Sequence, residues 1–246
     1  QELTHQNGLL NTALTALQDL HAETERDLKE ARALQQSLVP DRPHTYSRTR
    51  VSLLLEPCGQ IGGDLVGSFR VSETEIGVYG IDVSGHGVAS ALLGARISSF
   101  LQSARPDLNV AVEQDAEGLF TMLDPAEVCA RMNKLLLEEM ETDLYFTMLL
   151  VRIDLRAGLV RVAQAGHPGL MLVHKDGTIE TPGHGGFPIG LLPEAVYHSF
   201  DLPLRSGDRL LIYSDGFPDT TDGSGRLLED EGMLRLVQKN ISSKGQ

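Results

Sequence analysis

Apolar residues recur at heptad spacing along the N-terminal part of the chain. No proline and a single glycine interrupt residues 3–39, so this segment can form one continuous helix. Alternating steps of four and three residues define one stripe, which is apolar at both ends and polar in the middle: Leu10, Leu14, Leu17, His21, Thr24, Leu28, Ala31, Gln35 and Leu38. A narrow apolar stripe requires a partner surface. We therefore expect residues 1–39 to be a helix that forms a coiled-coil homodimer; the alternative is packing on its own domain.

Beyond Pro40 and Pro43, which would end this helix, the pattern changes to short apolar runs separated by Gly, Pro and Asp. Such runs are typical of β-strands. The expected strands are 51–56, 65–71, 76–82, 145–154, 159–165, 169–174 and 209–214. Short connections join 145–154 to 159–165, and 159–165 to 169–174, so we expect both pairs to form antiparallel hairpins.

Three segments of the remaining chain have helical patterns. They run from Val88 to about Ser103, from Pro125 to about Glu141 and from Glu229 to about Asn240. Asp124 is the expected N-cap of the second helix, with Pro125 as its first residue. Helices inserted between antiparallel strands, without regular alternation of strand and helix, indicate an α+β fold class.

Composition narrows the class of protein. Of 246 residues, 41% are hydrophobic and 22% are charged, as in ordinary globular domains. The formal net charge of -13 argues against nucleic acid or an anionic membrane as partner, because both require a basic face. The sequence contains neither a signal peptide nor a run of about 20 apolar residues. Because the sequence starts at Gln1 and not at Met, we expect it to be part of a longer protein.

The cysteines bear on the compartment. Cys58 and Cys129 are far apart, and neither has a CxxC partner. This spacing argues against a disulfide scaffold or a zinc site. We expect two reduced, buried thiols in a cytoplasmic protein.

Three acidic loops carry the candidate chemistry. Asp64 follows two glycines, Asp82 ends an apolar run and precedes Val-Ser-Gly-His-Gly, and Asp215 follows Arg-Leu-Leu-Ile-Tyr-Ser. A single Asp-Gly pair is most often only a turn. Three carboxylates without matching His or Cys ligands are typical of a site for a hard cation such as Mg²⁺ or Mn²⁺. Two such ions bridged by one aspartate can hold a hydroxide and clamp a phosphoryl group.

These loops belong to an ordered set of motifs. The set is Gly62-Gly63-Asp64, Asp82-Val83-Ser84-Gly85-His86-Gly87, Ala165-Gly166-His167-Pro168, Pro188-Ile189-Gly190 and Ser214-Asp215-Gly216. Over roughly residues 38–236, the chain resembles the SpoIIE/RsbU branch of the PPM-type, metal-dependent protein serine/threonine phosphatases. The resemblance implies a sandwich of two antiparallel β-sheets flanked by helices, with the metal site at one end. Residues 40–246 would form this phosphatase-like domain.

The resemblance also implies roles for individual residues. Asp82 would bridge the two metals, the backbone carbonyl of Val83 would be a further ligand, and Asp64 and Asp215 would bind on either side. The implied reaction is direct hydrolysis of a phosphomonoester by activated water, without a phospho-enzyme. In bacteria such domains often follow a receiver domain and a coiled-coil linker in a response regulator. Their usual substrates are phosphoserine or phosphothreonine on STAS-type antagonists of anti-sigma factors.

Three other residues in these motifs have more than one interpretation. His86 either holds the turn between its two glycines or acts on the phosphate or leaving group. His167 is expected to be structural and to shape the end of a sheet near the site. Ser84 is expected to cap the helix after Gly87 and not to act as a nucleophile.

Two departures from the family pattern favour a second function. The family usually has another acid where this chain has Gly67, and its closing Asp-Asp-x-Thr strand does not occur before Gln246. The acids soon after Asp215 are too close in sequence to replace that strand. A site with one carboxylate fewer should bind its second metal more weakly. The alternative is a degenerate, RssB-like domain that acts as a non-catalytic adaptor for a sigma factor or an anti-sigma antagonist.

Overall fold

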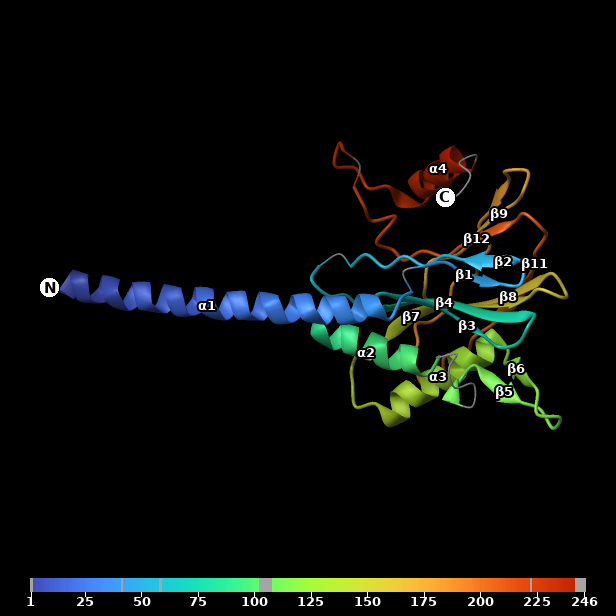
Figure 1. The fold of residues 1–246 in the computed structure, drawn as a ribbon, viewed down its shortest axis with the longest axis horizontal. Helices are drawn as coiled ribbons and strands as arrows, with labels where there is room; N and C mark the ends of the chain where they lie inside the picture. Colours follow the sequence, from blue (N-terminus) through green and yellow to red (C-terminus); the bar gives the residue numbers. More distant parts are fainter. Residues whose placement is uncertain (1, 41, 58, 102–107, 222, 242–246) are drawn as a thin grey trace.

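The computed structural model describes residues 2–40, 42–57, 59–101, 108–221 and 223–241 (Figure 1). In chain order the elements are α1 (Glu2–Ser37), β1 (His44–Tyr46), β2 (Thr49–Val51), β3 (Leu65–Arg70), β4 (Glu75–Val83), α2 (Val88–Ser99), β5 (Val112–Gln114), β6 (Phe120–Met122), α3 (Pro125–Glu139), β7 (Phe146–Asp154), β8 (Leu159–Ala165), β9 (Met171–Val173), β10 (Ile179–Glu180), β11 (Ser199–Pro203), β12 (Arg209–Leu211) and α4 (Glu229–Asn240).

The strands form two sheets and two small ribbons. The main sheet has five antiparallel strands in the order β11-β8-β7-β4-β3. The second sheet has three antiparallel strands in the order β10-β9-β12, while β1 pairs with β2 and β5 with β6. The hairpin predicted for 145–154 and 159–165 is confirmed as β7 and β8.

The two sheets pack on each other and are covered by helices on their outer faces (Figure 1). Val78 of β4 and Leu172 of β9 lie in the aliphatic core between the sheets. On the opposite face of the main sheet, Ile97 of α2 lies in the core that α2 and α3 cover. Met171 faces the other way from Leu172 and lies in a small apolar cluster with Met233 of α4. The layers confirm the α+β class and the predicted sandwich flanked by helices.

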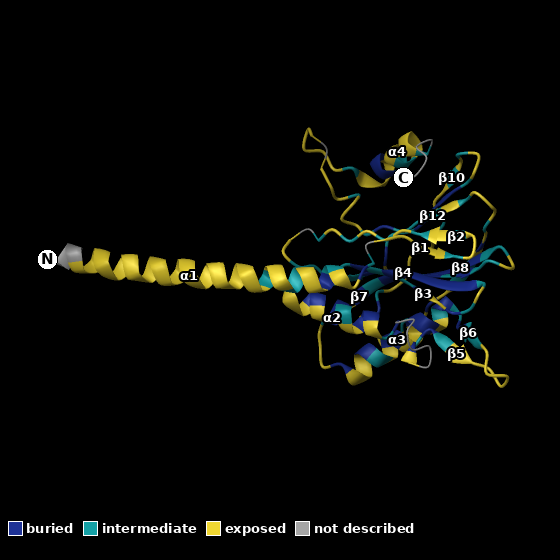
Figure 2. Ribbon diagram, viewed as in Figure 1, coloured by how far each residue is buried: buried dark blue, intermediate teal, exposed yellow. Residues whose placement is uncertain are grey.

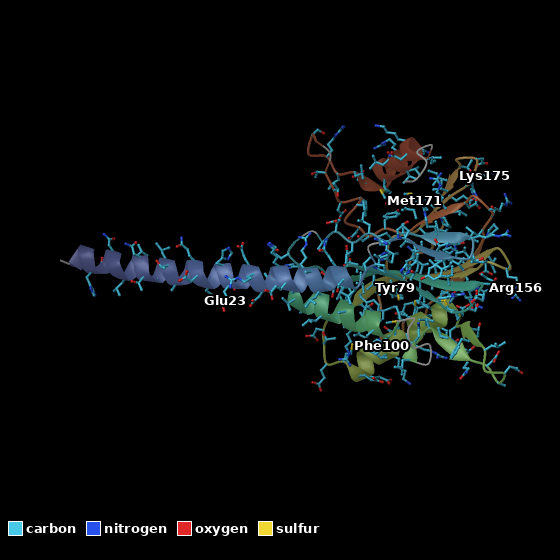
Figure 3. The ribbon with its side chains drawn as sticks, in the orientation of Figure 1. Glu23, Tyr79, Phe100, Arg156, Met171 and Lys175 are labelled. Atoms are coloured by element: carbon cyan, nitrogen blue, oxygen red, sulfur yellow. The ribbon has the colours of Figure 1, made fainter. Side chains whose placement is uncertain are left out.

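Helix α1 extends away from the domain for most of its length (Figures 1 and 2). Leu10, Leu14 and Leu17 are 57%, 49% and 67% exposed. Glu23, farther along the same helix, also stands clear of the other elements (Figure 3). The predicted long helix is therefore confirmed, but the first half of its apolar stripe is uncovered within one chain.

The C-terminal end of α1 packs on the domain. Gln35 is buried, and its amide Nε2 donates to the carbonyl of Gly62 at 2.6 Å. The N–H of Gly62 donates back to Gln35 Oε1 at 3.3 Å, and Arg32 donates to the carbonyl of Gly59 at 3.1 Å. This part of the stripe follows the alternative of packing on its own domain, and it joins α1 to the loop that leads to Asp64.

Two of the predicted strand arrangements are wrong. Only Val51 of the segment 51–56 belongs to a strand, and Leu53 and Leu55 pack against the helix-covered core without strand pairing. The hairpin expected between 159–165 and 169–174 does not form, because β8 pairs with β7 and β11 while β9 pairs with β10 and β12. The short connection therefore crosses from one sheet to the other.

The C-terminal end of α2 also differs from its predicted position. Helix α2 ends at Ser99 and not near Ser103, and the last predicted residues fall in 102–107, outside the described part of the chain. Among the described residues, no helix combines the length and the apolar character needed to cross a membrane.

One of the two cysteines lies in the described part of the chain. Cys129 of α3 is a free and fully buried thiol, and burial, with the nearby charge of Asp124, raises its pKa to about 12. It is therefore a packing residue and not a nucleophile. Cys58 lies outside the described residues.

Candidate functional site

Three segments bring the predicted aspartates to one end of the sandwich. Asp82 is the second-last residue of β4, and Asp64 directly precedes β3. β3 and β4 are antiparallel, and Leu65 lies opposite Ile81. One position further along the same register, Asp64 therefore lies opposite Asp82. Asp215 follows β12 in the second sheet and interacts electrostatically with Asp82.

Ser214 joins two of the three loops. Its hydroxyl donates to Asp64 Oδ2 at 2.9 Å, although 150 residues separate them in sequence. Because Ser214 is adjacent to Asp215, this hydrogen bond ties the loop of Asp215 to that of Asp64. No role was predicted for Ser214, and its position before Asp-Gly is the signal that could have suggested one.

The clustered charges shift the titration of two aspartates. Burial, followed by the charges of Asp64 and Asp215 and a hydrogen bond to Asp64, raises the pKa of Asp82 to about 7. Burial also raises the pKa of Asp215, as do the charges of Asp64 and Asp219. These shifts are typical of carboxylates crowded in a site.

Asp219 is a fourth carboxylate that the sequence did not assign to the site. The chain makes a helical turn after Asp215, in which the N–H of Asp219 donates to the Asp215 carbonyl at 2.9 Å. Residues four apart in such a turn lie on the same side. Proximity in sequence, which had argued against this acid, is what places its charge close to Asp215.

Gly63 allows the first loop to lie on the backbone of β4. A Cβ at this position would overlap the carbonyl oxygen of Val83, and the Val83 N–H donates to the Gly63 carbonyl at 3.4 Å. The close approach explains the second glycine of Gly62-Gly63-Asp64. The Val83 carbonyl faces this loop, and its role as a metal ligand stays a prediction.

The turn after Val83 is held differently from the prediction. Ser84 does not cap α2, whose N-cap is Gly87 without a side-chain hydrogen bond. The Ser84 hydroxyl instead accepts from the Tyr145 N–H at 3.1 Å, and the Ser84 N–H donates to the Tyr145 carbonyl at 2.9 Å. His86 is exposed in this turn, and both of its interpretations stay open.

Gly67 lies on the opposite face of β3 from the site. By strand alternation it shares the helix-covered side with Leu65 and Phe69, and a Cβ on it would overlap the ring of Tyr79. The acid that the family usually has at this position would therefore enter the core and not the site. The departure at Gly67 is explained by packing in this chain.

A cavity of about 670 Å³ opens beside Asp82 and Asp215. Its wall includes residues 166–171, the loop 181–183 and, from α4, Asp230 and Glu231. The cavity is therefore acidic, and Asp82 and Asp215 form part of its wall. It is large enough for a small ligand or for one side chain of a protein substrate.

His167 forms part of the cavity wall and is 3% exposed. Its Nδ1 is 2.9 Å from the hydroxyl of Thr147. Burial lowers the pKa of His167 to about 4, an effect that the backbone of Tyr213 partly opposes. The ring is therefore neutral at neutral pH, and its position agrees with the expected structural role near the end of the sheet.

The donor set fits a hard cation in its chemistry. Carboxylate oxygens that are held together and partly buried favour protonation, as the raised pKa of Asp82 indicates, and a divalent cation would offset their repulsion. In the part of the chain that the structure describes, no three His, Cys, Asp or Glu side chains already converge in an arrangement that could hold a metal. The aspartates would have to move toward one another to bind one.

The sequence matches one protein family model and is similar to named bacterial phosphatases. The family model of stage II sporulation protein E (SpoIIE) matches residues 72–246. The phosphoserine phosphatase RsbP of Bacillus subtilis is 26% identical over 204 residues, which are 83% of this chain and 48% of RsbP. The phosphoserine phosphatase RsbU of the same organism is 23% identical over 231 residues, covering 94% of this chain and 64% of RsbU. The chain thus spans less than two thirds of these relatives.

Solved structures share the fold. The SiaA-PP2C domain of Pseudomonas aeruginosa has a TM-score of 0.68 at 16% identity and covers 90% of this chain and 84% of its own. The PP2C phosphatase domain of SpoIIE from Bacillus subtilis, solved with a fragment of its regulatory domain, has a TM-score of 0.55 at 17% identity and covers 76% and 49%. Since the family model spans most of the sequence, this chain belongs to the SpoIIE family, and it shares the fold of PP2C domains.

Proposed function

We propose that this chain is the metal-dependent serine/threonine phosphatase part of a bacterial response regulator, and that it hydrolyses phosphoserine or phosphothreonine on a protein that regulates sigma-factor activity. The observation that carries the proposal is the placement of Asp64, Asp82 and Asp215 at one end of the sandwich, beside a cavity. Two relatives named as phosphoserine phosphatases support the reaction class.

Asp64, Asp82 and Asp215 would hold Mn²⁺ or Mg²⁺, with Asp82 between two ions and the Val83 carbonyl as a further ligand. When bound, these ions supply Lewis-acid activation of water and neutralise charge on the phosphoryl oxygens. RsbX, a solved structure of similar fold with 15% sequence identity to this chain, was determined in complex with magnesium. No side-chain nucleophile is needed in this scheme.

The chain's own residues orient the reaction. The hydroxyl of Ser214 donates to Asp64 Oδ2 and so orients this carboxylate beside Asp82. The sheet behind Asp82 holds its backbone in place through pairing with Thr147. The cavity gives a phosphorylated side chain a path to these carboxylates.

The test is a phosphatase assay with the full chain, a phosphoserine peptide and Mn²⁺. Asp82→Asn should lower kcat/KM by about 100-fold or more, because it removes a charge that the metal requires. Asp176→Asn is a matched control, since Asp176 accepts hydrogen bonds from Thr178 in an exposed turn away from the cavity. Equal turnover by both variants, or no metal-dependent turnover by the native chain, would refute the enzymatic proposal.

The second candidate is a non-catalytic adaptor that binds a sigma factor or an anti-sigma antagonist. It is favoured by the lack of a ready-made three-ligand set within the described residues. An adaptor should retain its protein partner in a pull-down with EDTA and with Asp82→Asn. Loss of the partner under either condition would count against it.

The wider organisation is also proposed and not established. We propose a cytoplasmic protein in which residues 1–39 form a signalling helix and residues 40–246 the phosphatase-like domain. The uncovered Leu10, Leu14 and Leu17 support homodimerisation through α1, which sedimentation velocity can measure. The closing aspartate strand of the family stays unassigned here, and residues 242–246 lie outside the described part of the chain.

A further inference from the structure

His167 stands between the two sheets at the end that carries the aspartates. It belongs to the connection from β8 to β9, which crosses from the main sheet to the second sheet. Its backbone is held on both sides, because Gly166 bridges to Met148 of β7 and the Gln164 amide donates to the His167 carbonyl at 2.7 Å. The ring therefore starts from a fixed point between the layers.

On the main sheet, the ring is anchored beside Asp82. Its Nδ1 is 2.9 Å from the hydroxyl of Thr147. Thr147 is the residue of β7 that lies directly opposite Asp82 of β4. Paired residues of neighbouring strands project from the same face, so Thr147 and Asp82 lie side by side on the face that looks toward the second sheet.

On the other side, the ring abuts the segment that leads to Asp215. A Cβ built on Gly80 would be 3.1 Å from His167 Nε2 and 3.0 Å from a methyl of Ile212, so both side chains occupy the space above this glycine. Ile212 is three residues before Asp215, and Tyr213 lines the same cavity as His167. The imidazole is thus a spacer between the strand of Asp82 and the loop of Asp215.

The ring is well suited to act as a rigid spacer. It is 3% exposed, its Nδ1 is held by the Thr147 hydroxyl, and the backbone of Tyr213 interacts with the ring from the second sheet. Burying a polar ring costs free energy that these interactions must offset. An aliphatic side chain of similar size would fill the space without this cost, but it could not hydrogen-bond Thr147.

We propose that His167 is a positioning residue that sets the separation of Asp82 and Asp215, through Thr147 on one sheet and Ile212 on the other, and so determines the affinity of the site for a divalent cation. The proposal rests on the metal-dependent function proposed above. Groups that orient metal ligands commonly change metal affinity by about 10–100-fold when they are substituted. His167 itself binds neither the cation nor the substrate.

The main experiment compares Mn²⁺ binding by calorimetry in the full chain and its variants. His167→Gln, which replaces the rigid ring with a flexible side chain of similar length, should weaken Mn²⁺ binding by about tenfold or more. Thr147→Val, which removes the anchoring hydroxyl with little change in volume, should weaken it in the same direction. Excess Mn²⁺ should restore kcat in both variants while KM for the phosphopeptide stays close to native. His174→Gln is the matched control, because His174 lies outside the cavity and should leave Mn²⁺ affinity unchanged.

A second measurement separates this inference from the proposed function. Hydrogen exchange in EDTA should be faster at residues 82–84 and 212–216 in both variants, since loosening the spacer acts without metal. Native Mn²⁺ affinity in His167→Gln, accompanied only by lower stability, would reduce His167 to a packing residue. If the native chain binds no Mn²⁺, the metal-dependent function fails, and unchanged exchange at both segments would then overturn the positioning role as well.

Discussion

His174 shows how a single side chain near the surface couples protonation to folding. Its Nε2 is 2.8 Å from Glu180 Oε1 and its Nδ1 is 3.4 Å from Asp208 Oδ2. The hydrogen bond to Glu180 contributes most to raising the pKa of His174 above its ordinary value. Burial opposes this increase, and the interactions with Asp208 add to it. The protonated ring is therefore favoured in the folded protein.

The resulting stabilisation should be complete below about pH 6.5, the ordinary histidine pKa, and should be lost as pH rises through the higher pKa of the folded state. His174→Gln should remove this part of the pH dependence. The measurement is the free energy of urea unfolding of both proteins at several values between about pH 6 and pH 8.5. An identical slope in the two proteins over this range would contradict the assignment.

The residues of the site were predictable to the extent that local sequence carries the signal. Asp64, Asp82 and Asp215 each stand beside glycine or follow an apolar run, and these patterns are visible without a structure. The Ser-Asp-Gly motif marks Ser214, but its partner Asp64, 150 residues away, could not be assigned. The same holds for the partner of Thr147, 20 residues away, because both contacts depend on how the sheets meet. Contacts of this kind leave no periodic trace in the sequence.

At the level of elements, the start of α3 is a local device with long-range contacts. The carboxylate of Asp124 accepts from the Ala126 N–H at 2.9 Å, as predicted for an N-cap, and Pro125 occupies the first turn. The same carboxylate also accepts from the hydroxyl of Ser199 in β11 and from Arg161 in β8. The cap therefore joins the helix to two strands of the main sheet.

Asp124→Ala should lower the free energy of unfolding by about 1–2 kcal/mol, the upper part of the range for a lost N-cap. Urea unfolding is the measurement. Asp176→Ala, which removes an exposed turn aspartate, should cost clearly less and serves as the control. A cost for Asp124→Ala no greater than that of the control would show that the cap contributes little.

Element predictions succeeded where an apolar pattern was long. Strands β4 and β7 and helices α3 and α4 have such patterns, and they form close to the predicted positions. The short strands β1, β5, β6, β10 and β11 were missed, since two to five residues carry too little periodicity. The run 51–56 misled for the opposite reason, because apolar residues can pack on a core without pairing.

At the scale of the whole molecule, the uncovered stripe on α1 determines whether two chains associate. Leu14→Glu combined with Leu17→Glu should convert a dimer into a monomer, because both leucines lie on the stripe and would bring like charges together in the pair. Sedimentation velocity of the full chain measures this change. Leu9→Glu, on an equally exposed leucine outside the stripe, should leave the dimer intact. A native protein that is monomeric at all concentrations would exclude pairing through α1.

The sandwich could be predicted as a whole, but the path of the chain between its sheets could not. The family resemblance implied two packed antiparallel sheets, and the layers agree. The connection from β8 to β9 looked like a hairpin by its length, although it changes sheets. Length alone cannot separate these two paths, because Gly166, with a φ of 72°, lets the chain turn out of the first sheet.

The fixed base of α1 gives the molecule a mechanical property. With 36 residues and a rise of about 1.5 Å per residue, this helix is a lever about 54 Å long, attached near its end by the reciprocal hydrogen bonds of Gln35 and Gly62. A tilt of about 5° at the base displaces the free tip by about 5 Å. Conversely, a small sideways force on the tip produces a large torque at the base, because the helix is long. This torque acts on the loop that ends at Asp64.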